Sequence, residues 1–158
     1  MEIITYDEIY KQQIIDLILH IQNDEAKIGL SIEEQPDLLD IYNSYINNGG
    51  NFWIAVEQNT VIGTIGLMIR ENRCDILKKF FVKSEYRGQR IGCRLYRTLI
   101  SFAENIGLHY LILDTPSVAK RSHKFYEQQG FTRITKVELP IEYQYPDRDS
   151  LLYLLELI

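Results

Sequence analysis

The sequence has few cysteines and prolines and no long apolar run. Its two cysteines, Cys74 and Cys93, have no metal-ligand spacing and no disulfide pattern, so we interpret them as reduced thiols. No apolar stretch approaches the ~20 residues that a membrane-spanning helix needs. The first residues lack the basic and apolar regions of a signal peptide. These absences predict a cytoplasmic protein without a membrane partner.

Positive charge is also scarce overall. The chain has 17 Lys and Arg against 22 Asp and Glu, a formal net charge of −5. Since binding to nucleic-acid backbones requires clustered Lys and Arg, the balance argues against a nucleic-acid partner. The positive charge gathers instead at Arg87, Arg90, Arg94 and Arg97, which suits a small phosphorylated ligand. The sequence has no cluster of His, Cys and Asp that would predict a metal site.

The remaining composition is that of an ordinary globular protein. Apolar residues make up 46% of the 158 residues and charged residues 25%. This length predicts one domain over residues 1–158.

Hydrophobic periodicity and turn residues predict alternating helices and strands. Thr5 and Glu8 have capping-box spacing before the first helix. Pro36 fits the first turn of the second helix. We expect strands at 3–5, 52–57, 61–69, 75–82, 109–114, 131–139 and 151–158, and helices at 7–23, 36–46, 91–106 and 118–129.

The segment from Val82 to Gly92 is the most informative part of the chain. An apolar strand runs into a turn with two arginines and two glycines, and an amphipathic helix follows directly. Free backbone N–H groups and the positive end of the helix dipole therefore meet at one place, which suits a phosphate. The segment lacks the Gly-Lys-Ser/Thr ending of a nucleotide-hydrolysing loop and the G-x-G-x-x-G spacing of a dinucleotide-binding loop.

The frame R-x-x-R-x-G at Arg87, Arg90 and Gly92 resembles the GNAT family of N-acetyltransferases, whose usual pattern is R/Q-x-x-G-x-G/A after a strand. In that family the loop holds the pyrophosphate of acetyl-CoA. Arg90 stands where glycine is commoner. Its side chain can point outward if its φ is helical, whereas a positive φ would strain it.

A second motif, F-Y-x-x-x-G-F from Phe125 to Phe131, also recurs in that family. The order of predicted elements follows the family fold as well. The resemblance implies an α/β (α+β) GNAT fold. This fold is a mixed, mostly antiparallel sheet of about seven strands, splayed in the middle and flanked by about four helices.

The resemblance also implies which residues bind acetyl-CoA. The backbone of Phe80, Phe81 and Val82 would pair with the pantetheine arm like an added strand. The pyrophosphate would take N–H groups and charge from the loop residues Arg87, Gly88, Gln89, Arg90, Ile91, Gly92 and Cys93. Many members place an asparagine where this chain has Ala119, and Ser122 is a possible substitute.

Two side chains are candidates for catalysis. By resemblance, Tyr126 is the general acid toward the departing thiolate of coenzyme A; the alternative is that Tyr126 only packs beside Phe125. Asp114, at the end of the short strand 109–114, is a candidate base, either directly or through water, or a group that binds the substrate ammonium. It can also simply cap the turn at Thr115 and Pro116.

The sequence thus predicts an acetyl-CoA-dependent N-acetyltransferase that acts by direct attack of a primary amine of a small molecule or peptide in a ternary complex. The alternative is an acyl-CoA-binding sensor without turnover. The loop from Tyr143 to Pro146 is a candidate acceptor wall or subunit contact. Polyamines, aminoglycosides, amino acids and protein N-termini remain open as acceptors, as do O-acetylation, longer acyl groups and a homodimer.

Overall fold

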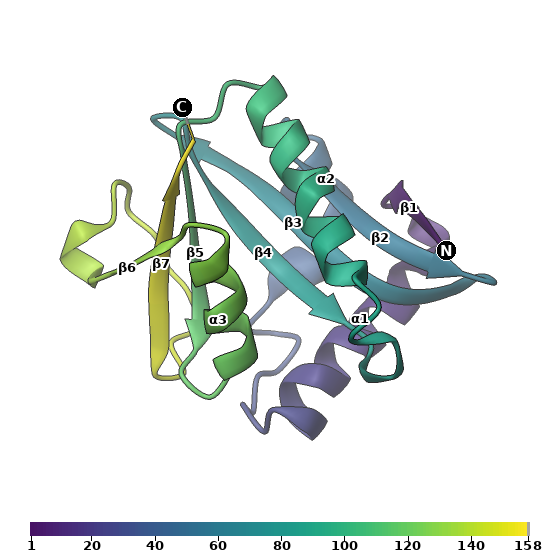
Figure 1. Cartoon of the computed structure of the whole chain (residues 1–158). Coiled ribbons are helices and arrows are strands. Elements are labelled where there is room, and N and C mark those ends of the chain that lie inside the picture. Colours follow the sequence, from purple (N-terminus) through teal and green to yellow (C-terminus); the bar gives the residue numbers. More distant parts are fainter. Residues whose placement is uncertain (158) are drawn as a thin grey trace.

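A computed structural model describes residues 1–157, so Ile158, the last residue of the final predicted strand, lies outside the described residues. Within them, seven strands form one sheet in the order β1-β2-β3-β4-β5-β7-β6. Figure 1 shows α2 and α3 on one face of this sheet and α1 on the other. The strands are β1 (Glu2–Thr5), β2 (Asn51–Glu57), β3 (Thr60–Glu71), β4 (Cys74–Val82), β5 (Tyr110–Pro116), β6 (Thr132–Ile134) and β7 (Ser150–Glu156). The α-helices are α1 (Lys11–Leu19), α2 (Ile91–Asn105) and α3 (Lys120–Gln128).

The sheet divides at its only parallel pair among the described strands. β4 and β5 pair at three positions, the last being Ile76 opposite Ile112, while the other neighbouring strands are antiparallel. Beyond Ile76 the two strands diverge, as Figure 1 shows. Residues 77–82 of β4 therefore have no strand partner on the β5 side. The predicted mixed, splayed sheet is confirmed.

A β-bulge lies in β4 at the divergence. Thr64 of β3 pairs with Phe81 and Gly66 pairs with Lys78, so β4 has one extra residue between these pairs. Lys79 occupies the left-handed region at φ 55°. The Thr64 hydroxyl donates a hydrogen bond of 2.6 Å to the Lys79 carbonyl. The bulge re-aims the side chains of β4 beside the gap.

The two faces of the sheet bury separate apolar clusters. On the α2 and α3 face, Leu95 and Leu99 of α2 are fully buried against the sheet. On the α1 face, Ile14 and Ile18 are fully buried with Tyr45. The helical period of these buried positions is what makes α1 and α2 pack by one side.

Helix starts differ from the predictions in detail. The predicted capping box at Thr5 and Glu8 is wrong: Thr5 belongs to β1, and the Asp7 carboxylate accepts the N–H of Ile9 instead. The first helix begins with a 3-10 turn at Glu8–Tyr10 and ends with π-helical residues His20–Glu25. The predicted helix at 36–46 is a 3-10 turn (Pro36–Leu39) and a π-helical turn (Tyr42–Ile46).

The C-terminal elements also differ from the predictions. The predicted strand 131–139 is short, because a capping box between Thr135 and Glu138 starts a 3-10 turn at Lys136–Glu138. The predicted end of the fifth strand at Asp114 is early, since β5 pairs with β7 as far as Pro116. None of the helices in residues 1–157 combines the length and apolarity needed to cross a membrane.

Candidate functional site

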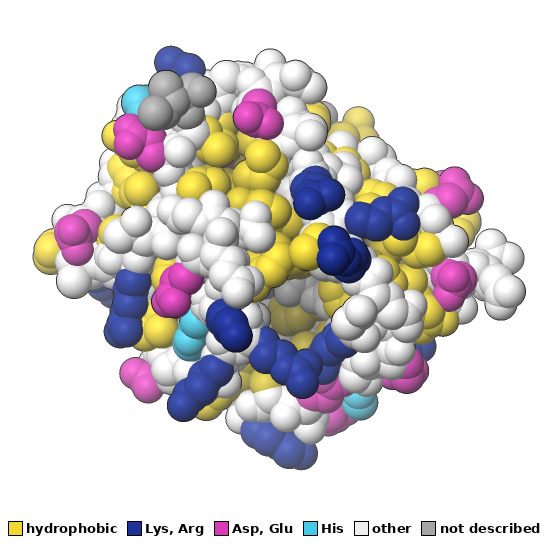
Figure 2. Space-filling model, in the orientation of Figure 1, with side chains coloured by type: hydrophobic (Ala, Val, Ile, Leu, Met, Phe, Trp, Pro, Cys, Tyr) yellow, Lys and Arg dark blue, Asp and Glu magenta, His cyan; other side chains and the backbone are white. Residues whose placement is uncertain are grey.

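A cavity of about 620 Å³ lies where β4 and β5 diverge. Its walls come from β4, β5, the loop before α2, the first turns of α2 and α3, and the segments 21–30 and 146–150. Figure 2 shows this face hollowed near its centre, with Lys and Arg side chains gathered around the opening. Both candidate catalytic residues, Tyr126 and Asp114, line the cavity. So do all the predicted cofactor residues except Gln89, which is exposed.

The loop before α2 presents a run of free backbone donors. The first helical hydrogen bond runs from the Arg94 N–H to the Arg90 carbonyl at 3.1 Å. In the described part of the chain, no acceptor is recorded for the N–H groups of residues 88–93. Gly88 and Arg90 have positive φ values of 81° and 64°, which bend the chain around this spot. Such a concave run at a helix N-terminus binds anions.

The two loop arginines have different roles. The Arg87 guanidinium forms an ion pair of 2.8 Å with Glu25 and donates to the Val82 carbonyl, so it braces the loop. Arg90 is exposed and lines the cavity without a recorded carboxylate partner among residues 1–157. Arg121 at the start of α3 also lines the cavity. Arg90 and Arg121 therefore supply positive charge to the cavity wall.

Arg90 adopts a positive φ, the conformation that the sequence analysis expected to be strained. Its φ of 64° and ψ of 15° lie in the left-handed region, where a side chain costs roughly 1–2 kcal/mol. A Cβ at the neighbouring Gly92 would meet the Phe80 ring and Val82 at 3.6 Å, an ordinary contact distance. The conformational demand of the loop thus falls on Gly88 and Arg90.

Tyr126 is buried in an aromatic cluster with its hydroxyl at the cavity. Its ring packs against Phe131 and Phe80 with centroid separations of 5.4 and 6.3 Å. The Tyr126 hydroxyl makes no hydrogen bond within residues 1–157. Every fully buried side-chain oxygen in these residues has a hydrogen-bond partner, so this hydroxyl is not fully buried and faces the cavity that Tyr126 lines. Burial, with the nearby Asp114 and Tyr96, raises the pKa of Tyr126 well above its usual value.

Asp114 lies on β5 just beyond the last β4–β5 pair. The Tyr143 hydroxyl donates a hydrogen bond to its carboxylate. Burial raises the pKa of Asp114, while the bond from Tyr143 and the charges of Lys78 and Lys79 oppose this rise. The turn-capping alternative is not what is found, because the recorded side-chain partner is Tyr143 rather than the backbone at Thr115 and Pro116.

Lys79 is a buried cation at the wall of the cavity. Its ammonium donates to the Gln35 side-chain carbonyl at 2.8 Å and lies 3.7 Å from the Asp37 carboxylate. Gln35 also exchanges amide hydrogen bonds with Gln22 at 2.8 and 2.9 Å. Burial lowers the pKa of Lys79 to about 8, against the opposing effect of Asp37.

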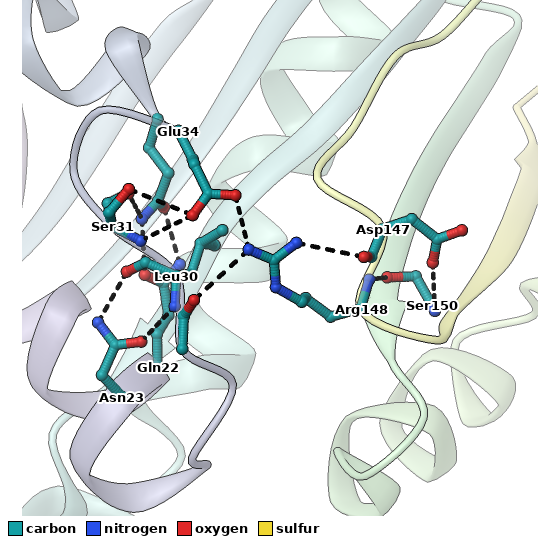
Figure 3. A network of polar contacts seen from close by, with 10 residues as sticks. Gln22, Asn23, Leu30, Ser31, Glu34, Asp147, Arg148 and Ser150 are labelled. Atoms are coloured by element: carbon teal, nitrogen blue, oxygen red, sulfur yellow. Dashed lines mark hydrogen bonds and ion pairs between the residues drawn. The ribbon is translucent and has the colours of Figure 1, made fainter.

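Arg148 lines the cavity and joins two chain segments, as Figure 3 shows. Its guanidinium forms an ion pair of 2.6 Å with Glu34 and donates to the Gly29 carbonyl at 3.4 Å. On the Glu34 side, the Asn23 side chain exchanges hydrogen bonds with the Leu30 backbone at 2.6 and 2.8 Å. These contacts fix the segment 23–34 beside the cavity.

Several lining residues were missed by sequence reasoning. Lys78, Lys79, Arg121 and Arg148 all line the cavity, and the sequence analysis assigned them no role. Two adjacent lysines in an otherwise apolar strand were the available signal for the first pair. The predicted wall at Tyr143–Pro146 does contribute, through Pro146 in the lining and Tyr143 at Asp114.

Comparison with known proteins gives a consistent result. The model of the Acetyltransferase (GNAT) family matches residues 15–131. The crystal structure of an acetyltransferase from Streptococcus agalactiae 2603 is 42% identical, with a TM-score of 0.95 over 99% of this chain and 98% of that one. An acetyltransferase of the GNAT family from Staphylococcus aureus Mu50 is 34% identical, also with a TM-score of 0.95, over 98% of both chains.

Among curated proteins, the chain is 35% identical over 107 residues to the Probable N-acetyltransferase family 8 member 5 of Mus musculus. That match covers 65% of this chain and 47% of the mouse protein. The chain spans about half the length of the curated relatives it matches.

Proposed function

Because this chain belongs to the GNAT family of acetyltransferases, we propose that it transfers the acetyl group of acetyl-CoA to a primary amine of a small molecule or peptide. One observation supports this most directly. A run of free N–H groups at residues 88–93, an unpaired edge of β4 and the Tyr126 hydroxyl all face one cavity. These features suit three parts of acetyl-CoA. The N–H groups suit its diphosphate, the β4 edge suits its extended amide-bearing arm, and the hydroxyl suits its leaving sulfur.

In this proposal the cosubstrate lies along the gap between β4 and β5. The N–H groups of residues 88–93 bind the pyrophosphate, with added charge from Arg90 and Arg121. The backbone of Phe80, Phe81 and Val82 pairs with the pantetheine arm. Ser122, which lines the cavity, or the local backbone supplies the polar contact that Ala119 lacks.

The reaction is a direct attack in a ternary complex. The amine nitrogen forms a bond to the thioester carbonyl carbon, and the carbon–sulfur bond breaks. The substrate ammonium gives one proton to Asp114 before the attack, directly or through water. The nitrogen of the adduct gives a second proton to the departing thiolate, which leaves as the thiol. An amine at pKa ~10.4 and an ordinary aspartate at ~3.9 differ by about 9 kcal/mol in proton affinity, and the raised pKa of Asp114 narrows this gap.

Tyr126 acts on the leaving sulfur. A phenol of ordinary pKa is already a weaker acid than a thiol by ~1.5 units, and burial raises the pKa of Tyr126 further. Full proton transfer is therefore unfavourable, and the hydroxyl acts mainly by donating a hydrogen bond to the developing thiolate. Holding amine and thioester together contributes further, since proximity can be worth ~7–11 kcal/mol.

The test is amine-dependent release of the coenzyme A thiol by the wild-type protein and Tyr126→Phe. We expect thiol release that requires an amine, with a fall of about 100-fold in the variant and unchanged acetyl-CoA affinity. Binding of acetyl-CoA without any thiol release would favour a non-catalytic sensor. Thiol release that does not depend on any amine would indicate thioester hydrolysis and would contradict acetyl transfer to an amine.

The same proposal includes the protein's setting. We place the chain in the cytoplasm as one domain over residues 1–158, without nucleic-acid or membrane partners and without a metal. A homodimer would use the last strands, at the end of the sheet where β6 is the edge strand and β7 lies next to it. Light scattering of the purified protein tests the oligomeric state.

A further inference from the structure

Three cationic side chains outside the loop before α2 and helix α3 line the cavity. Lys78 and Lys79 come from β4 and Arg148 from the loop before β7. Asp114 is the one carboxylate that lines the cavity in the described residues. Lys79 contacts Gln35 and Arg148 contacts Glu34, so these two cations lie beside the segment 29–37 and not in the loop that we assign to the pyrophosphate. We take this part of the cavity as the end where the acceptor binds.

The carboxylates behind these cations match only part of the charge. Glu34 pairs with Arg148 at 2.6 Å and Asp37 lies 3.7 Å from Lys79, and neither carboxylate lines the cavity. Lys78 has no carboxylate within 4.0 Å in residues 1–157. The charge of Lys78 is therefore available to a bound anion, whereas that of Lys79 is opposed by Asp37.

Asp114 connects these cations to the chemistry. Asp114, Lys78 and Lys79 all line this cavity, and the charges of the two lysines oppose the rise that burial causes in the pKa of Asp114. An acceptor amine that approaches Asp114 therefore enters a site with two lysines beside it. A polycation such as a polyamine or an aminoglycoside would bring further positive charge against them, which is unfavourable in a partly buried site.

The remaining wall of this end is apolar. Ile28, Leu30 and Pro146 line it, and Leu30 is buried. Such a wall accommodates a hydrocarbon substituent rather than a sugar or a second charged group.

Resting on the proposed acetyl transfer, we infer that the acceptor is an amino acid or amino-acid derivative with a free carboxylate and an apolar side chain. Lys78 binds its carboxylate, Asp114 faces its amine, and Ile28, Leu30 and Pro146 contact its side chain. Lys78 is the specificity-determining residue in this arrangement.

The experiment measures amine-dependent thiol release from acetyl-CoA with matched acceptors. The panel contains the natural amino acids, each beside its carboxamide, together with spermidine, kanamycin, and phosphoethanolamine beside ethanolamine. We expect amino acids with apolar side chains to be the best acceptors, with kcat/KM at least 10-fold above their carboxamides. Acetylation of spermidine, kanamycin or phosphoethanolamine in preference to every amino acid would overturn the assignment, as would equal use of acids and carboxamides.

Lys78→Gln links the preference to the named site. It should raise KM for the best amino acid about 10-fold, with a small effect on kcat and on its carboxamide. Lys124→Gln, an exposed lysine of α3 outside the cavity lining, is the matched control and should behave like the wild-type protein. If Lys78→Gln weakens acid and carboxamide equally, the carboxylate contact is wrong. If the wild-type protein releases no thiol with any acceptor of the panel, the result would instead count against the proposed function.

Discussion

Tyr143 donates a hydrogen bond to the carboxylate of Asp114 from a loop 29 residues further along the chain. The bond reaches Asp114 where β5 leaves β4, at the wall of the cavity. It favours the ionised carboxylate and so opposes the pKa rise that burial causes. Tyr143 is therefore a positioning residue for the proposed base.

Tyr143→Phe should shift the pH profile of the reaction. Without the donated bond the pKa of Asp114 rises, so the acid limb of kcat/KM should move to higher pH by about one unit. Tyr145→Phe is the control, because the Tyr145 ring packs beside Tyr143 at 5.1 Å without a recorded bond to Asp114. An acid limb that stays in place in Tyr143→Phe would remove Asp114 ionisation from the mechanism.

Asp114→Asn should separate activity from stability. The asparagine still accepts the Tyr143 bond but cannot take a proton, so kcat/KM should fall by about 100-fold or more. A carboxylate with a raised folded pKa loses stability as pH rises through that pKa, and asparagine avoids this loss. Thermal unfolding at pH 7 should therefore give a midpoint equal to or above that of the wild-type protein. Activity within two-fold of wild type would contradict the base assignment.

The stability of the protein should rise above pH 8 because of Lys79. The polar and charged groups near the Lys79 ammonium are Asp37 and the Gln35 amide from the segment 35–37, Lys78 from its own strand and Asp114 from β5. Its folded pKa of about 8 is below the ordinary 10.5, so the unfolded chain holds more protons and stability increases between these values. Relative to Lys79→Met, the free energy of unfolding of the wild type should gain up to about 3 kcal/mol between pH 8 and 10.5.

Urea unfolding of the wild type and Lys79→Met at several pH values measures this difference, since titrations of other groups largely cancel. Lys124→Gln should follow the wild-type curve. If the unfolding free energies of wild type and Lys79→Met change with pH in parallel, the pKa of Lys79 is the same in the folded and unfolded chain, which contradicts the prediction.

Arg90→Gly should stabilise the fold and weaken cosubstrate binding. Glycine removes a left-handed strain of roughly 1–2 kcal/mol, partly offset by about 0.5–1 kcal/mol of added chain entropy. A gain of up to about 1 kcal/mol in unfolding free energy is expected, with a several-fold higher Kd for acetyl-CoA from the lost charge. Arg90→Lys keeps both charge and strain, so it should change neither quantity much. Lower stability in Arg90→Gly would show that Arg90 makes contacts that outweigh its strain.

The local features of the fold were predictable from the sequence. Period-two and helical patterns located the three strands between Phe52 and Val82 and the helix after Gly88, because each depends on neighbouring residues. The turn at Gln58 and Asn59 has two positive φ values, as a tight hairpin requires. The cavity residues next to the two motifs followed from the family resemblance.

The long-range contacts of the site were not predictable in the same way. Arg87 meets Glu25 across 62 residues, and Arg148 meets Glu34 across 114. No local pattern specifies such pairs. The bulge that places Lys79 beside Asp37 arises from a register shift between β3 and β4, which one strand's sequence does not encode.

The central claim is that the free N–H groups of residues 88–93 bind the diphosphate of coenzyme A, and titration calorimetry tests it most directly. Acetyl-CoA should bind with one site per chain, and S-acetylpantetheine, which lacks the diphosphate, should bind at least 10-fold more weakly. Equal affinity for the two compounds, or no binding of acetyl-CoA, would contradict the account.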